Sequence, residues 1–172
     1  ETAANGALFV KIDRKRKIAV TTLLRALGMN DASMKEAFKH VDQGQASHVD
    51  LTLEKDPTKG TNEALIEVYR RLRPGALATV VNARGLIENM FYNYKRFDFS
   101  RVGRYKINKR LNLDVTNTIE NRVMRLQDLV AIVAEIIRLN NTQEPVDDID
   151  SLANRRVKLV GELVQRQFRI GL

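Results

Sequence analysis

The fold of this chain is decided by residues 126–139, whose sequence is LQDLVAIVAEIIRL. Apolar residues recur there every three or four positions, which is the spacing of one face of an α-helix. They form a wide apolar face and comprise Leu126, Leu129, Val130, Val133, Ile136 and Ile137. Such a face has to be covered by other elements, so the stretch predicts a core helix of a mainly helical domain.

Two short helices are predicted on either side of Gly28. Thr21 or Thr22 is expected to cap the first and Gly28 to end it, while Asn30 or Asp31 caps the second. The pair is either a helix-turn-helix or an ordinary pair of helices packed on the core. The second helix carries as many acids as bases, which favours core packing.

Three more helices follow from the same periodicity. Thr61 is expected to cap one over 61–72. This helix should end before Pro74, because proline disfavours helical geometry in the preceding residue. Another spans about 78–91, and a last one passes through Val157 and Val164. The polar stretch 42–60 is predicted to be a variable loop.

A β-hairpin is predicted near the N-terminus, where residues 7–13 and 18–20 have strand character. Five cations lie between Lys11 and Lys17 at its turn. They form either a solvated turn or a clamp for phosphate, since neighbouring cations repel one another unless an anion offsets them, and Arg14 is the candidate DNA contact. The predicted fold class is α+β, predominantly α-helical with short β-hairpins.

The composition restricts the functional classes. A net charge of +8 points toward a polyanion such as nucleic acid. The absence of cysteine excludes disulfides and zinc bound by thiolates, and two histidines alone cannot build a metal site. No signal peptide or membrane span is recognised, so we expect a soluble intracellular chain, and both ends suggest a piece of a larger protein.

Residues 91–110 interleave aromatic rings with seven cations and a single acid. This pattern suits single-stranded nucleic acid, because rings stack on bases while cations follow phosphates. The alternative is a hairpin whose rings face the core and whose cations are solvated.

Residues 146–156, VDDIDSLANRR, place three carboxylates before two adjacent arginines. Asp147, Asp148, Asp150 or Ser151 could cap the last helix, since a carboxylate or hydroxyl oxygen is favoured at a helix N-terminus. A metal role fails because the calcium-loop pattern breaks at Leu152 and Ala153. No glycine-rich phosphate loop, GxSxG or HExxH motif occurs in the chain, so no catalytic role is indicated. A close cluster of acids, bases and apolar residues in a basic chain instead suits a site that discriminates the edge of a base.

Several stretches together resemble the lobe of the β subunit of bacterial DNA-directed RNA polymerase, almost from end to end. They are Val10–Lys17, Thr22–Gly28, Leu53–Asp56, Glu63–Leu65, Tyr69–Gly75, Arg101–Lys106, Asp147–Asp150, Asn154–Arg156 and Val160–Leu163. The resemblance implies a lobe domain over 1–153, and over 154–172 the start of a helix that leads back to the adjoining protrusion or fork region.

The resemblance also implies a function. The lobe lines the downstream DNA channel, and Ile149, Asp150 and Arg155 match a pocket for a flipped non-template guanine. Arg73 and Arg96 match positions near the single-stranded non-template DNA. No catalytic or metal-binding residue is expected here, because the resemblance assigns the Mg²⁺ of nucleotidyl transfer to another subunit.

The implied partners are DNA, the β′, α, ω and σ subunits and transcription factors, with no membrane, in the cytoplasm at the nucleoid. Two alternatives remain. One is a protein-interaction module that docks transcription factors and uses its charge to steer assembly. The other is a stand-alone helix-turn-helix that binds DNA.

Overall fold

The computed structural model describes residues 1–12, 17–44, 47–142, 144, 148–153, 155 and 157–171. The chain divides into two compact units, Glu1–Thr142 and Gln143–Leu172. The predicted boundary at 153/154 therefore lies inside the second unit.

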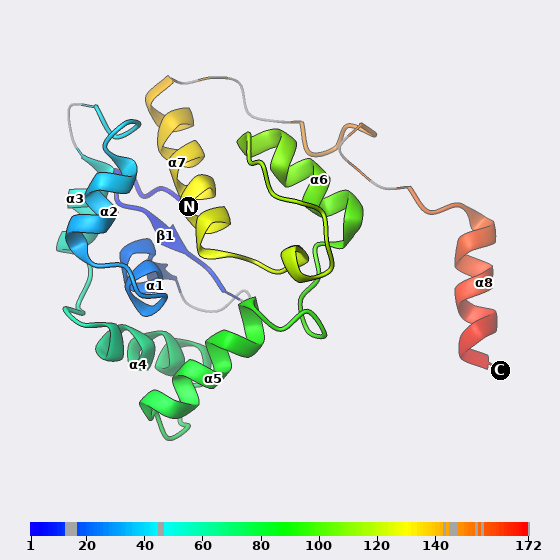
Figure 1. Cartoon of the computed structure of the whole chain (residues 1–172), viewed down its shortest axis with the longest axis horizontal. Helices are drawn as coiled ribbons and strands as arrows, with labels where there is room; N and C mark the ends of the chain where they lie inside the picture. The colour runs from blue at the N-terminus through cyan, green and yellow to red at the C-terminus, as the bar shows by residue number, and fades with distance from the viewer. Residues whose placement is uncertain are drawn as a thin grey trace. The chain divides into compact units, whose positions relative to one another are not determined.

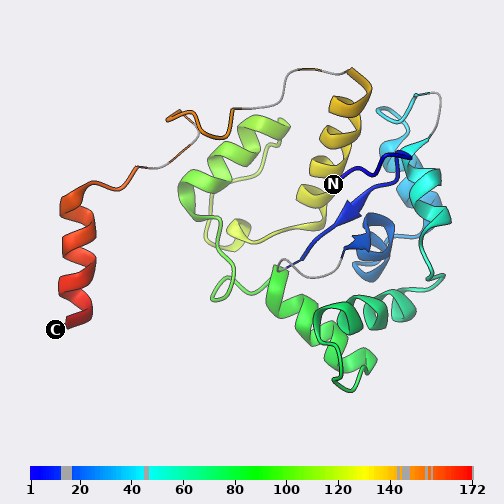
Figure 2. The ribbon, with the colours of Figure 1, turned by 180° about the vertical axis from the view of Figure 1, so that it is seen from behind.

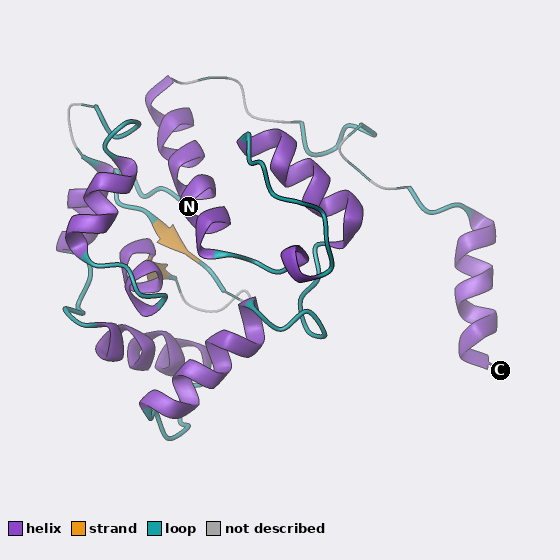
Figure 3. Ribbon diagram, viewed as in Figure 1, coloured by secondary structure: helices purple, strands orange, loops and turns teal. Residues whose placement is uncertain are grey.

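Helices make up most of the first unit (Figures 1 and 3). In chain order its elements are β1 (Phe9–Val10), β2 (Ile18–Ala19), α1 (Val20–Ala26), α2 (Asp31–Phe38), α3 (His48–Glu54), α4 (Thr61–Leu72), α5 (Val80–Phe91), α6 (Ser100–Leu111), the 3₁₀ turn η1 (Glu120–Arg122) and α7 (Leu126–Thr142). The predicted α+β class, mostly helical with a short hairpin, is confirmed. In the second unit α8 spans Val160–Gly171.

The predicted hairpin is present: β1 and β2 are antiparallel, with Phe9 opposite Ala19 and Val10 opposite Ile18. Its turn, including Arg14, lies outside the described residues. The chain passes directly from β2 into α1, whose seven residues are all buried. Thr21 and Thr22 are therefore interior residues of α1, and the prediction that either one caps it is wrong. The prediction that Thr61 caps α4 is also wrong, because the N-cap is Gly60 and Thr61 is the first residue of the helix.

Helix α1 separates the two hydrophobic clusters of the core. Leu23 packs with the inner faces of α4 and α5, which lie side by side in both views (Figures 1 and 2). Leu24 packs with Phe38 of α2 and with Val133 and Ile137 of α7. The predicted core role of α7 is confirmed, but α1 contributes buried residues to both clusters, and Val10 of β1 packs against both as well.

Two predicted boundaries are confirmed by their local geometry. Asn30 caps α2 through a reciprocal arrangement, in which its side chain accepts from the Ser33 amide at 2.8 Å and the Ser33 hydroxyl accepts from the Asn30 amide at 2.9 Å. Gly28, which follows α1, has a φ of 102°, a value that favours glycine.

The prediction of a loop over 42–60 is wrong for α3. Ser47 caps this helix by accepting from the Asp50 amide at 3.2 Å. Asp42 holds its start by accepting from the amides of His48 and Val49, both at 2.9 Å. Burial raises the pKa of Asp42, but these hydrogen bonds and one from the Ser47 hydroxyl outweigh it, so the pKa is lowered overall.

Candidate nucleic-acid interface

Three exposed cations surround a cavity of about 540 Å³ in the first unit: Lys11, Arg73 and Arg96. Its apolar lining includes Phe91 and Phe97, and we call the site the basic groove. The fold thus brings together Arg73 and Arg96, which are far apart in sequence, and adds Lys11 from the basic run before Arg14.

Each cation of the basic groove is positioned by a local contact. Lys11 directly follows β1, and its ammonium lies 2.9 Å from the carboxylate of Glu1. Arg73 is the C-cap of α4, and its amide donates to the carbonyl of Tyr69 at 2.8 Å. The amide of Arg96 donates to the carbonyl of Asn93 at 2.9 Å, in the turn after α5.

The walls of the basic groove are apolar and partly aromatic. Phe97 meets Phe99 edge to face, with ring centroids 4.9 Å apart. The amide of Met124, another lining residue, donates to the carbonyl of Phe91 at 3.1 Å and ties the segment before α7 to the groove. No acidic side chain occurs among the described residues that line it. Cations beside a ring-bearing wall can bind phosphate while a base contacts the rings.

Ile149, Asp150 and Arg155 lie together in a turn of the second unit. The amide of Asp150 donates to the side chain of Asp148 at 3.0 Å, and the amide of Arg155 donates to the carbonyl of Ser151 at 3.1 Å. These turns bring the Arg155 guanidinium to 3.3 Å from the Asp150 carboxylate. The side chain of Arg155 is 60% exposed and that of Asp150 is 84% exposed. Ile149 is 77% exposed, so the two charged groups and their apolar neighbour are all accessible.

The prediction that this stretch caps the last helix is wrong for Asp148, Asp150 and Ser151, because α8 begins only at Val160. Asp147 lies outside the described residues. Asp148 instead accepts within its own turn and fixes the backbone at Asp150.

Residues 100–111 form α6, so the predicted hairpin alternative for 91–110 is wrong. Arg104 of α6 is fully buried, so this cation is neither solvated nor accessible to phosphate, contrary to both interpretations of the stretch. Arg104 donates to both carboxylate oxygens of Asp128, at 2.7 and 2.6 Å, and to the carbonyl of Val123 at 3.2 Å. Its guanidinium also lies 5.1 Å from the centre of the Phe99 ring. This pair fastens α6 to the first turn of α7 and is structural.

The remaining rings of the aromatic stretch divide by exposure. Tyr94 and Tyr105 are exposed, which leaves their faces accessible for stacking, whereas Phe91 and Phe97 are half-buried. Tyr92 lies between these extremes, and burial raises the pKa of its hydroxyl.

Lys11 was not named individually as a DNA contact, although it belongs to the run of five cations that the sequence offers as a possible phosphate clamp. Only the structure shows that Lys11 lines the same cavity as Arg73 and Arg96. Within the described part of the chain, no group of three histidine or acidic side chains could hold a metal ion. No helix there is long and apolar enough to cross a membrane.

Comparison with known proteins agrees with the resemblance seen in the sequence. The chain is 46% identical to the DNA-directed RNA polymerase subunit beta of Dehalococcoides mccartyi and 44% identical to that of Gloeobacter violaceus, over its full length in both cases. It spans 14% and 15% of these relatives. Residues 1–158 match the family model described as RNA polymerase Rpb2, domain 2. The chain therefore belongs to the RNA polymerase Rpb2, domain 2 family.

Proposed function

We propose that this chain is the lobe module of a bacterial RNA polymerase β subunit and that it handles DNA during transcription. The grouping of Lys11, Arg73 and Arg96 around the basic groove carries this proposal. In the assembled enzyme the groove binds the backbone of the single-stranded non-template strand, and the lobe lines the downstream channel. The net charge of +8 supports the same role.

The turn with Ile149, Asp150 and Arg155 contributes part of a pocket that reads a non-template guanine. A carboxylate can accept from the guanine N1–H and N2–H₂ groups, and a guanidinium can donate to O6. An exposed Ile149 beside them offers an apolar surface for the base. The exposed Asp150–Arg155 ion pair can separate at small cost when a base inserts.

The module supports nucleotidyl transfer without catalysing it. The Mg²⁺ of the reaction is assigned to another subunit, and no residue of this chain is proposed as a ligand. The working state is the cytoplasmic, nucleoid-associated assembly with the β′, α, ω and σ subunits.

The guanine pocket is tested by Asp150→Ala in the assembled polymerase. Promoter complexes are compared on templates that differ at one non-template position after another. We expect the preference for guanine to fall at one position by about 1–3 kcal/mol and to stay unchanged at the others. Asp114→Ala, which removes an exposed carboxylate of the first unit, is the control. An unchanged preference at every position would refute the pocket.

The basic groove is tested by Arg73→Ala in the same assembly. We expect open complexes to weaken with little base preference, and the slope of log K against log salt to fall by about one. Arg70→Ala removes an exposed arginine of the same helix that does not line the groove. If both variants keep the parental slope, Arg73 does not contact phosphate.

A further inference from the structure

One of the three cations of the basic groove is already paired with an acid. The ammonium of Lys11 lies 2.9 Å from a carboxylate oxygen of Glu1, and both side chains are about half exposed. Glu1 itself is not among the described residues that line the groove. Within the described part of the chain, Arg73 and Arg96 form no ion pair. The groove therefore presents two open cations and a third that an acid already occupies.

Backbone pairing holds Glu1 beside Lys11. The carbonyl of Glu1 accepts from the amide of Phe9 at 2.8 Å, and the nitrogen of Glu1 donates to the carbonyl of Phe9 at 3.0 Å. Thr2 likewise lies opposite Leu8 in an antiparallel bridge. These two residues thus run antiparallel to the start of β1, and Lys11 directly follows that strand. Pairing of the main chain, rather than of two flexible side chains alone, brings the opposite charges together.

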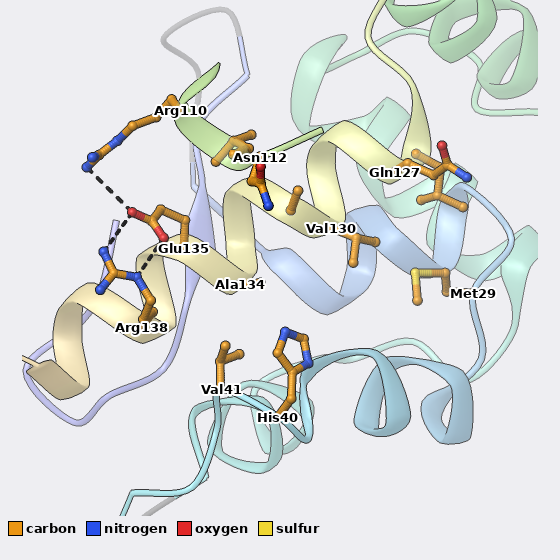
Figure 4. A pocket seen from close by; sticks show the side chains of 13 residues that line it. Met29, His40, Val41, Arg110, Asn112, Gln127, Val130, Ala134, Glu135 and Arg138 are labelled. Carbon is orange, nitrogen blue, oxygen red and sulfur yellow. Dashed lines mark hydrogen bonds and ion pairs between the residues drawn. The ribbon is translucent and has the colours of Figure 1, made fainter. Parts of the chain in front are cut away.

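A larger cavity of the first unit shows what a fixed arrangement of charges looks like (Figure 4). This cavity, of about 630 Å³, lies along α7, and its lining includes Glu135, Arg110 and Arg138. Glu135 is 19% exposed, accepts from Arg138 at 2.8 and 3.0 Å and lies 3.5 Å from Arg110. Glu1 is 47% exposed and pairs with a single described cation. Water and an incoming anion reach Glu1 more easily, so its pair with Lys11 can be exchanged.

We propose that Glu1 masks Lys11, so that a phosphate of the non-template strand must displace the Glu1 carboxylate to reach the third cation of the basic groove. A carboxylate and a phosphate make the same charge-assisted hydrogen bond to an ammonium. Both cannot share it without repulsion, because each carries a negative charge. The inference rests on the proposed binding of DNA in this groove, and it adds an internal competitor that weakens that binding.

Masking has a signature in the salt dependence of binding. Each phosphate that a cation neutralises contributes about 0.7 to the slope of log K against log salt for a single strand, through the release of counterions. A phosphate that merely replaces Glu1 contributes less, because the freed carboxylate attracts a cation from solution. Removing that carboxylate should therefore steepen the slope as well as tighten binding.

The test is Glu1→Gln in the assembled polymerase, with the stability of open complexes measured over a range of salt concentrations. Glutamine keeps the size of the side chain, and the strand pairing uses only the backbone of Glu1. We expect binding to tighten about two- to fivefold at low salt and the slope to steepen by up to about 0.7. Glu36→Gln is the matched control, because Glu36 is an exposed glutamate that pairs with Lys39, and neither residue lines the groove. It should change neither quantity.

Lys11→Ala shows whether the effect passes through the masked ammonium. With no ammonium left to unmask, the single variant Lys11→Ala and the double variant Lys11→Ala with Glu1→Gln should share one slope. A steepening by Glu1→Gln that persists without Lys11 would be a general effect of charge, and would overturn the proposal.

Two further outcomes separate this inference from the proposed function. If Arg73→Ala lowers the slope while Glu1→Gln leaves both affinity and slope unchanged, the groove binds phosphate but Glu1 does not mask Lys11. If neither variant changes the slope, the groove does not bind phosphate, and the inference fails together with the proposed function.

Discussion

Arg104 with Asp128 and Arg155 with Asp150 are the same chemical pair in opposite surroundings. In the first pair both side chains are 0% exposed and are joined by two short hydrogen bonds, while the second pair is exposed and separated by 3.3 Å. Burial makes the first pair indispensable for stability, because removing one partner leaves the other charge buried, with neither a counterion nor water to compensate it. Exposure leaves the second pair available to a ligand, because water already solvates both groups.

The largest expected effect comes from breaking the buried pair. Arg104→Met should lower the free energy of unfolding by about 3–5 kcal/mol, because Asp128 stays buried without its cation. Urea denaturation followed by circular dichroism measures this. The double variant Arg104→Met with Asp128→Leu should recover much of the loss, because it removes both charges. If the double variant is no more stable than the single one, packing rather than charge is what Arg104 supplies.

A smaller loss of stability is expected when acid protonates Asp56, which forms a third ion pair with Arg25. Arg25 also donates to the carbonyl of Thr58. Burial raises the pKa of Asp56, but hydrogen bonds from Thr58 and Thr22 outweigh it, so the pKa of the folded state lies below its usual value. The stabilisation is therefore complete above the unfolded pKa of about 4 and is lost as the pH falls through the folded pKa.

Urea titrations between about pH 6 and pH 3 test this sign. The parent chain and the exposed-site control Asp114→Asn should lose stability in parallel as the pH falls. Asp56→Asn should be less stable near neutral pH and should show a flatter dependence on pH. Curves that stay parallel for all three would mean that Asp56 is not linked to acid unfolding.

The smallest effect on stability is expected at the exposed pair. Asp150→Ala and Arg155→Ala should leave the urea midpoint of the chain unchanged, because surface pairs contribute little. A clear loss of stability in either variant would mean that the pair holds the turn together, and would weaken its assignment to base reading.

The sequence predicted what local periodicity encodes. The helices α2, α4, α5 and α7 were recognised because their apolar residues recur at helical spacing, and the hairpin because strand-forming residues flank a basic turn. Helix α3 was missed because its seven residues are mixed in polarity and it is held by Asp42 and Ser47. No periodicity reveals a helix that depends on such contacts.

The candidate sites were predictable only in part. Arg73 and Arg96 were named from the resemblance, but that they line one cavity with Lys11 depends on how the hairpin packs against α4 and α5. Arg104 was grouped with surface cations because its partner, Asp128, lies 24 residues further along the chain.

The buried clamp between α6 and α7 also has a consequence for how this family can vary. Because either residue alone becomes a liability once the other is gone, Arg104 and Asp128 should be replaced together in descendants of a common sequence. Asp150 and Arg155 carry no such mutual constraint from folding. If those two positions prove invariant across divergent lineages, selection on transcription rather than on stability is the force that keeps them.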